Sequence, residues 1–135
     1  MGDVALGVIT AHHYSAAAER PANKAFVAAY KKEYGENLNP GFMVVGAWDA
    51  MDAIFHAIRE QKGKIDPDKT MEILKRYRND NSPRGTIAID PETRDVMHNE
   101  YLREVRKVGG KLANVEIETI ATMIKDPYKQ FNPKK

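Results

Sequence analysis

One segment constrains the fold more than any other, because its apolar residues recur with the period of a helix. The stripe, whose members follow one another at spacings of four and three residues, consists of Val44, Trp48, Met51, Phe55 and Ile58. Side chains at these spacings lie on one face of an α-helix. The pattern therefore predicts a helix over about residues 43–61, with this stripe packed in the core.

Two further helices are marked by their start and stop residues. Pro21 suits a first helical turn and Gly35 a C-terminal stop, which predicts a helix over residues 21–34. Asp66 suits an N-cap and Pro67 the position after it, so a third helix begins there. Its apolar face is expected to consist of Met71, Leu74 and Tyr77.

Strands are predicted on both sides of the helices. The apolar run at 4–10 has the composition of a strand buried on both faces, although little else in the chain could flank it. After a loop at 79–85, residues 86–89 form a short strand. Strands at 96–107 and 112–122 are joined by a Gly109–Gly110 turn. The fold class is therefore α/β, with three helices plus a C-terminal β-hairpin.

The last strand shows an alternating pattern. Val115, Ile117 and Thr119 alternate with Glu116 and Glu118. This alternation predicts one dry face and one wet face, with both glutamates in solvent.

The composition excludes several classes of function. The 135 residues contain 42% hydrophobic and 30% charged residues, which is a globular profile, and the net charge of +2 gives no case for nucleic acid. The absence of cysteine excludes disulfides and thiol nucleophiles. No apolar run is long enough to cross a membrane. The N-terminus has no basic segment followed by an apolar one, so we expect no signal peptide in this chain.

The candidate catalytic and metal-binding residues all have simpler explanations. His12 and His13 are adjacent, so on a strand they would point apart, and His56 and His98 could join them only through folding. Asp49 and Asp52 share a helix face, where a solvated surface or a pair with Lys is expected. Glycine-rich nucleotide loops and nucleophile elbows are absent. We therefore expect no enzyme, no metal site and no cofactor.

Several motifs in a fixed order form a more specific signature. They are GVITAHHY at 7–14, PANKAF at 21–26, AWDAMDAI at 47–54, SPRG at 82–85 and IDPETRD at 89–95. The series resembles the C-terminal third of the periplasmic solute-binding proteins of ABC transporters, of the branched-chain amino acid type. The resemblance runs through nearly the whole chain.

The resemblance implies part of a type I periplasmic binding fold, with two lobes that close on a solute and then dock on an ABC permease. Mapped onto this single fragment, 1–10 belongs to the C-terminal lobe, 20–94 to the N-terminal lobe, 96–124 to the C-terminal lobe again, and 125–135 is a tail. The location implied is the periplasm. The rest of such a receptor supplies much of the polar recognition, so the fragment alone is expected to bind poorly.

The resemblance also suggests which residues line the solute cleft. Trp48 and Phe42 are candidates for its wall, and His13 and Tyr14 for its hinge side. Trp48 could equally be a core anchor, since it also belongs to the helix stripe. The implied solute is a branched-chain or other hydrophobic amino acid, or a similar small carboxylate. An aromatic carboxylate would suit the same bulky wall.

Two other functional classes remain open. Incomplete sheets with open edges can exchange strands between chains. One alternative is therefore a stand-alone interaction or sensor domain, which would work as a domain-swapped homodimer. An enzyme is a third possibility, because a fold never excludes a function, although no residue set predicts one.

Overall fold

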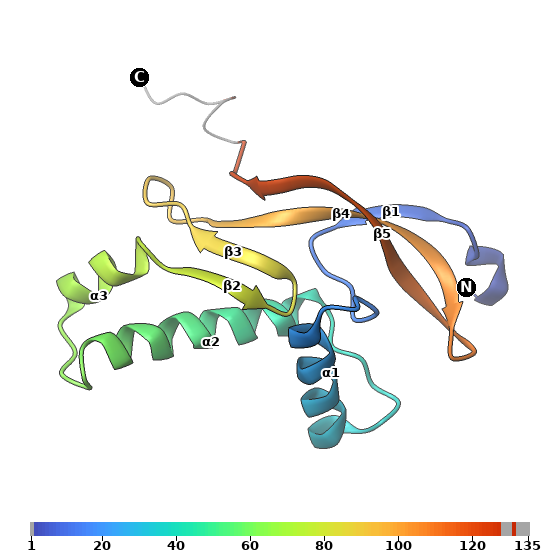
Figure 1. Cartoon of the computed structure of the whole chain (residues 1–135), viewed down its shortest axis with the longest axis horizontal. Coiled ribbons are helices and arrows are strands. Elements are labelled where there is room, and N and C mark those ends of the chain that lie inside the picture. Colours follow the sequence, from blue (N-terminus) through green and yellow to red (C-terminus); the bar gives the residue numbers. More distant parts are fainter. Residues whose placement is uncertain (1, 128–130, 132–135) are drawn as a thin grey trace.

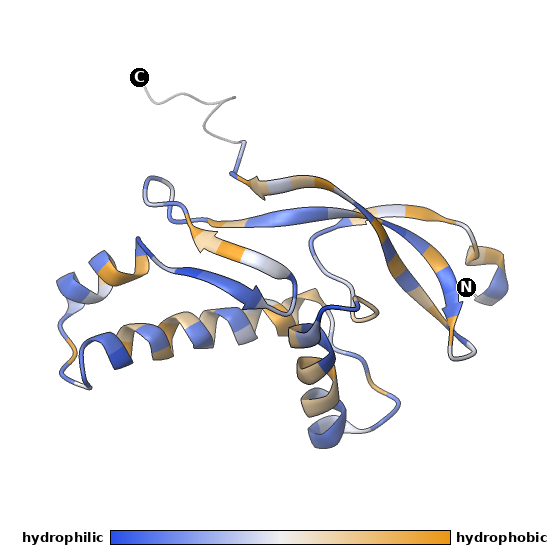
Figure 2. Cartoon of the chain, in the orientation of Figure 1, coloured by the Kyte–Doolittle hydropathy of each residue, from blue (hydrophilic) through white to orange (hydrophobic). Residues whose placement is uncertain are grey.

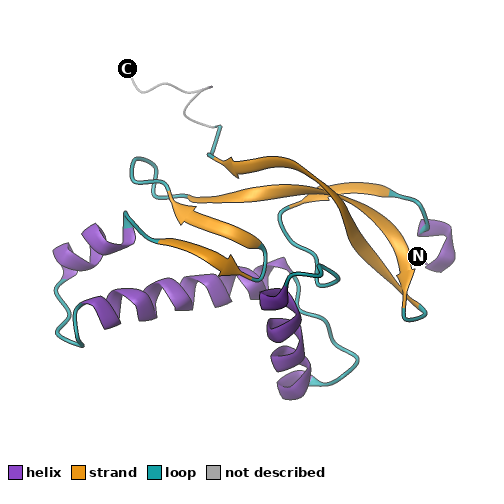
Figure 3. Cartoon of the chain, in the orientation of Figure 1, coloured by secondary structure: helices purple, strands orange, loops and turns teal. Residues whose placement is uncertain are grey.

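The computed structural model describes residues 2–127 and 131 (Figure 1). The helices and strands are η1 (Gly2–Ala5), β1 (Ile9–His12), α1 (Pro21–Tyr34), α2 (Phe42–Glu60), α3 (Pro67–Leu74), β2 (Arg78–Ser82), β3 (Gly85–Ile89), β4 (Val96–Val108) and β5 (Lys111–Ile124). The three α-helices lie on one side of the strands, and β4 with β5 forms a long hairpin (Figure 3). Of the predicted tail at 125–135, residues 128–130 and 132–135 lie outside the described residues.

The predicted positions of the three helices and the hairpin are confirmed, although the third helix buries Ile73, while Met71 of its predicted face is exposed and Tyr77 lies beyond its end. The Asp66 side chain accepts a hydrogen bond from the Lys69 backbone N–H at 2.8 Å, as an N-cap does. Gly109 and Gly110 both have positive φ, 57° and 77°, which a two-residue hairpin turn of this kind requires. None of the described helices is long and apolar enough to cross a membrane.

The predicted buried strand at 4–10 is wrong. Residues 2–5 form a single 3₁₀ turn, and the backbone N–H groups of Leu6 and Val8 donate to Asp3 and Ala5. The strand begins only at Ile9 and pairs antiparallel with β4. Gly7 and Val8 also exchange backbone hydrogen bonds with Val105 of β4, but the apolar run stays largely exposed, with Val8 and Ile9 about half accessible.

The predicted loop at 79–85 is also wrong. Residues 78–82 form β2, which pairs antiparallel with β3 across a register shift between Asn79 and Ser82. Polar residues have low strand propensity, but β2 is the last strand of the sheet and most of its side chains face outward. Pairing with β3 therefore overrides the local turn preference.

The core face of α2 differs from the predicted one. The buried positions are Val45, Asp49, Ala53 and Ala57, which recur every four residues. Trp48, Met51, Phe55 and Ile58 of the stripe are 38–50% exposed. Figure 2 shows apolar positions recurring along α2. Both sides of the helix carry apolar residues, and the described part of the chain buries the side with Val45 and Ala53, which packs on Phe26 at one end and on β3 at the other.

The core consists of two small clusters along α2. The first holds Tyr14, Phe26 and Val45, and the second holds Ala53, Tyr77 and Ile87. Each cluster joins α2 to segments distant in sequence, namely the end of the β1–α1 segment and strand β3. The core thus fixes where residues 12–20 meet the start of α2.

All the strand pairs in the described sheet are antiparallel, in the order β1-β4-β3-β2, with β5 beside β4. β4 pairs with β3 only at Met97 and Val96, whereas it pairs with β5 along nearly its whole length. We call residues 21–89 the helical part, and residues 9–12 with 96–124 the hairpin part. The segments 13–20 and 90–95 connect them.

The prediction that β5 has one buried face and one solvent-exposed face, with Glu116 in solvent, is wrong. The Glu116 side chain is only 14% exposed, while Ile117 is 41% exposed. The β4–β5 ladder shifts register at three places, including one between Leu102 and Arg103 opposite this segment. Such irregularities change which side chains face a neighbouring element.

Candidate functional site

Four rings gather where β1 ends and α2 begins. The His12 and His13 rings stack with centroids 4.3 Å apart, and Phe42 meets them edge-on at 5.1 Å and 6.2 Å. The His98 ring lies 4.9 Å from that of His13. We call these four residues the ring cluster. The histidines do not point apart as predicted, because His13 lies in a bend just beyond the last residue of β1. His56 lies elsewhere, against Tyr77.

The surroundings of His12 and His13 favour neutral imidazoles. Burial and the nearby Arg84 guanidinium lower the pKa of His13 to about 4, and burial together with Arg103 lowers the pKa of His12. His12 Nδ1 accepts a hydrogen bond from the Tyr14 backbone N–H at 3.3 Å, which places a proton on Nε2 of the neutral ring. Among the described residues, no group of three or more His, Cys, Asp or Glu is arranged to hold a metal ion.

A cavity of about 520 Å³ opens beside the cluster. Phe42 and His12 form part of its wall, and its polar or charged border consists of Ser15, Lys31, Asn39, Arg103, Lys111 and Asn114. None of the described residues that line it is Asp or Glu. The lining therefore combines aromatic faces with a basic rim.

Two features at this cavity add to its affinity for negative charge. One Nη of Arg103 donates to the Tyr14 carbonyl at 2.6 Å, while its buried Nε has no hydrogen-bond partner among the described residues. Helix α2 begins at the cavity wall with Gly41 as N-cap, and no side chain caps it. An uncapped helix N-terminus presents backbone N–H groups and a partial positive charge.

The fold places the predicted site residues in two separate regions. The structure brings His13 and Phe42 together, and Tyr14 borders the same cavity although it is 3% exposed and packs on Phe26. Trp48 lies apart from them, 50% exposed. Its ring is 5.2 Å from Phe26, in a separate groove between α1 and α2.

Asp49 is not on a solvated face and does not pair with Lys. It is buried and accepts hydrogen bonds from Arg84 Nε and the Ser82 hydroxyl, both at 2.7 Å. Burial raises the pKa of the Asp49 carboxyl, against the lowering effect of Ser82 and Arg84. Asp52 accepts from the Tyr77 hydroxyl at 2.6 Å. Both carboxylates therefore hold the fold together.

Sequence reasoning missed Arg103 and assigned no role to His98. Both lie on β4, more than 80 residues after the histidine pair, and reach the site through strand pairing: His12 pairs with Tyr101 in the ladder. No local motif marks either residue, so only the strand register could have identified them.

The cavity thus combines ring faces, a basic rim and an open helix N-terminus. The chain belongs to the periplasmic binding protein family, whose sequence model matches residues 1–111. This family consists of solute-binding, non-enzymatic components of transport, in agreement with the expectation that the chain is not an enzyme.

Known relatives support the same assignment. The chain is 41% identical, over 120 residues, to the Leu/Ile/Val-binding protein homolog 6 of Brucella abortus strain 2308, covering 88% of this chain and 30% of the relative. An ABC transporter solute-binding protein of Rhodopseudomonas palustris BisB5, in complex with 3,4-dihydroxybenzoic acid, is 50% identical with a TM-score of 0.87. The match covers 96% of this chain and 34% of that one.

A solute-binding protein of R. palustris HaA2, in complex with p-hydroxybenzoic acid, is 39% identical with a TM-score of 0.79 and matches 91% of this chain and 33% of that one. The chain therefore spans about a third of the length of these relatives. The predicted resemblance and the partial type I fold are confirmed.

Proposed function

We propose that the chain forms part of the solute cleft of an ABC-transporter receptor for small aromatic carboxylates. The observation that carries the proposal is the cavity with aromatic walls and a basic rim. A flat ring would pack on Phe42 and His12, with the predicted wall residue His13 stacked on His12, and its carboxylate would meet Arg103 or the open start of α2. Tyr14 would support this wall from the core.

An aromatic acid fits this cavity better than a branched-chain amino acid does. An amino acid also carries an ammonium group, which needs a carboxylate or several carbonyl acceptors. The described lining offers no Asp or Glu. The neutral, stacked histidines and Phe42 instead present ring faces, and aromatic pairs gain about 1 kcal/mol beyond burial. The two Rhodopseudomonas relatives, whose structures hold hydroxylated benzoates, support this choice.

The division of the chain supports its assignment to two lobes. We assign the helical part to the N-terminal lobe and the hairpin part to the C-terminal lobe, with residues 13–20 as one crossing between them. The exposed stripe on α2 would pack against the remainder of the receptor. The whole receptor would act in the periplasm and deliver its solute to an ABC permease.

A chimera tests the solute class. In it, this chain replaces the corresponding third of the R. palustris BisB5 protein, and titration calorimetry measures the binding of 3,4-dihydroxybenzoate, benzoate and leucine. We expect the aromatic acids to bind and leucine not to. Tighter binding of leucine than of either aromatic acid would refute the proposed solute class, and the unmodified BisB5 protein serves as the control for assembly.

Variants of the chimera test the wall residues. Phe42→Leu removes a ring face and is expected to weaken aromatic-acid binding roughly 10-fold, which corresponds to the loss of one aromatic contact. His13→Leu should act in the same direction. Trp48 stays a predicted cleft residue, but its position predicts a smaller effect of Trp48→Leu. If Trp48→Leu weakens binding more than Phe42→Leu does, the cleft lies on the α1–α2 groove.

One observation favours a second function, that of a stand-alone oligomeric interaction domain. The exposed apolar stripe on α2 could be covered by another copy of the chain. A stable oligomer that binds a solute without any further receptor segment would support this alternative.

A further inference from the structure

Arg20 lies at the junction of the two parts of the chain and contacts three different elements. It is the last residue of the 13–20 segment, directly before α1. Its two Nη atoms donate to the Glu116 carboxylate of β5 at 2.7 Å and 2.9 Å. Its Nε donates to the Pro83 carbonyl, in the turn between β2 and β3, at 3.1 Å.

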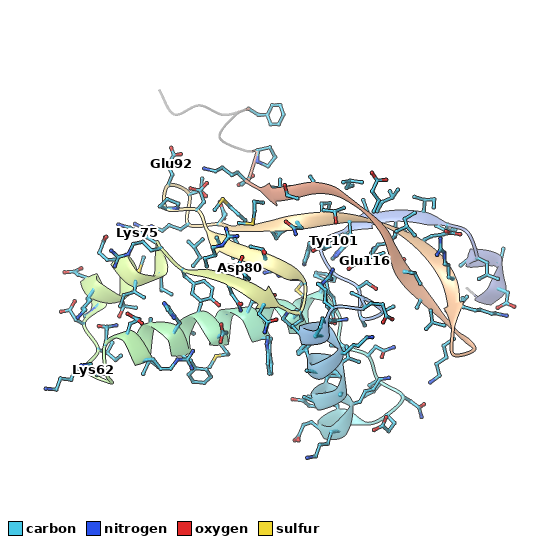
Figure 4. All side chains as sticks on the ribbon, in the orientation of Figure 1. Lys62, Lys75, Asp80, Glu92, Tyr101 and Glu116 are labelled. Carbon is cyan, nitrogen blue, oxygen red and sulfur yellow. The ribbon has the colours of Figure 1, made fainter. Side chains whose placement is uncertain are left out.

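The same guanidinium lies over the Tyr101 ring of β4, 4.7 Å from its centroid. Tyr101 in turn donates its hydroxyl proton to the Arg84 carbonyl at 2.8 Å. Gly85 makes this approach possible, because a side chain at that position would collide with the Tyr101 hydroxyl. Figure 4 shows Tyr101 and Glu116 between the strands and the start of the helices.

The Arg20–Glu116 pair is shielded and has the forked geometry of a strong ion pair. The side chains are 26% and 14% exposed, and two parallel N–H···O bonds fix their relative orientation. Although burial acts in the opposite direction, the hydrogen bond and charge of Glu116 raise the pKa of Arg20.

Several contacts join the two parts, but among those that the structure describes Arg20 makes the ion pair between the start of α1 and β5. The sheet ladder between β3 and β4 has two residue pairs, Ala88 with Met97 and Ile89 with Val96. Neutral contacts add to it: the hydroxyl of Tyr101 donates to the Arg84 carbonyl, and the rings of His12 and Phe42 meet. Arg20 adds a charged, forked link that ties Pro83 of the helical part to Glu116 of the hairpin part. Charged hydrogen bonds of this geometry are stronger and more directional than neutral ones.

We propose that Arg20 is a positioning residue, which through Glu116 and Pro83 fixes the hairpin part against the helical part. In doing so it sets the distance between Phe42 at the start of α2 and Arg103 of β4 across the cavity. In a receptor that closes by hinge motion, this link would bias the hinge toward one orientation.

The absence of cysteine allows a direct test in this chain. Spin labels are attached at Glu60→Cys, at the exposed end of α2, and at Lys107→Cys, near the far end of β4. Electron–electron double resonance then measures the distribution of distances between the two parts. Glu116→Gln, which is nearly isosteric, should broaden the distribution roughly two-fold because it removes the ion pair that opposes hinge rotation.

A matched control breaks an ion pair that does not join the two parts. Glu104 pairs with Arg106 within β4 at 2.7 Å, so Glu104→Gln should leave the distribution narrow. Far-UV circular dichroism verifies that each variant is folded. If Glu116→Gln unfolds the chain, Arg20→Lys provides the milder change, since it keeps the charge and loses the fork.

The proposal is overturned if the folded Glu116→Gln or Arg20→Lys variant gives the distribution of the unsubstituted chain, or if Glu104→Gln broadens it equally. These measurements use no solute. They therefore stand independently of the proposed solute class, which the chimera tests separately.

Discussion

The residues Asp49 and Arg84 stabilise the fold as a pair, although nothing near either residue in the sequence indicates this role. Both side chains are buried, and their pair links α2 to the turn between β2 and β3. A buried charge without its partner is strongly destabilising, whereas replacing both partners with apolar residues is often tolerated. Replacing one partner should therefore lower the free energy of unfolding more than replacing both partners does.

We expect Arg84→Met to lower the free energy of unfolding by about 3–5 kcal/mol, because it leaves the Asp49 carboxylate buried and unpaired. The double variant Asp49→Leu with Arg84→Met should recover most of this loss. Urea denaturation measures the free energy of unfolding of the single and the double variant. The control is Arg106→Met, which breaks a largely exposed pair and should cost less than about 1 kcal/mol. Equal losses for Arg84→Met and Arg106→Met would contradict the burial argument.

His13 is the residue whose titration should be visible in the stability of the chain. Its pKa in the fold is about 4, below its ordinary value of 6.5, because of burial first and then of the nearby guanidinium groups of Arg84 and Arg103. Between pH 6.5 and 4 the unfolded chain therefore binds a proton at this position and the folded chain does not. The corresponding stability is present above pH 6.5 and is lost as the pH falls toward 4.

We therefore expect His13→Phe, which keeps a ring but cannot titrate, to reduce the fall in melting temperature between pH 7 and pH 4.5. Calorimetry of both proteins across this range provides the measurement. His56→Phe, outside the ring cluster, is the comparison variant. A His13→Phe profile parallel to that of the unsubstituted chain would show that His13 titrates normally in the fold.

At the scale of elements, α2 has apolar residues on two faces, and only one of them is covered by the described chain. Val45 and Ala53 face the two core clusters, while Trp48 and Phe55 are about half exposed. A helix that is apolar on all sides is normally buried on all sides. Within this chain, however, the free energy of unfolding should depend on the face of α2 that carries Val45.

Val45→Ala is expected to lower the free energy of unfolding by about 2 kcal/mol, because it opens a cavity in a fully buried position. Phe55→Ala removes more atoms but should cost less than about 1 kcal/mol in this chain, since its side chain is half in solvent. Urea denaturation distinguishes the two. The assignment of the core face would be wrong if Phe55→Ala were the more damaging variant.

At the scale of the whole molecule, the exposed stripe determines how the chain behaves in isolation. Large apolar patches on a soluble protein mark surfaces that are normally covered. A net charge of only +2 provides little repulsion between copies. The isolated chain therefore resembles a receptor segment whose neighbours are absent.

We expect light scattering to show association of the isolated chain that increases with concentration. Phe55→Glu, which places a charge on the stripe, should shift the chain toward monomer. Phe55→Glu would not affect a domain-swapped dimer, in which strands exchange and α2 keeps its surroundings. A dimer that resists this substitution would therefore indicate strand exchange, and a monomer at every concentration would contradict both forms of association.

Sequence by itself determined the elements whose signals are local. The caps at Pro21 and Asp66, the helical period of residues 43–61 and the Gly109–Gly110 turn depend on backbone geometry within a few residues. Each was located to within a few positions for that reason. The ordered motifs also identified the family.

Only the tertiary structure decided which faces of these elements are covered. Periodicity shows that a stripe is apolar, but it cannot show whether its partner lies in the same chain, so the α2 stripe was placed in the core and is exposed. Glu116 was placed in solvent, because nothing near it in sequence signals Arg20, which lies 96 residues away. Burial and ion pairing are set by contacts between distant segments, and a linear pattern does not contain those distances.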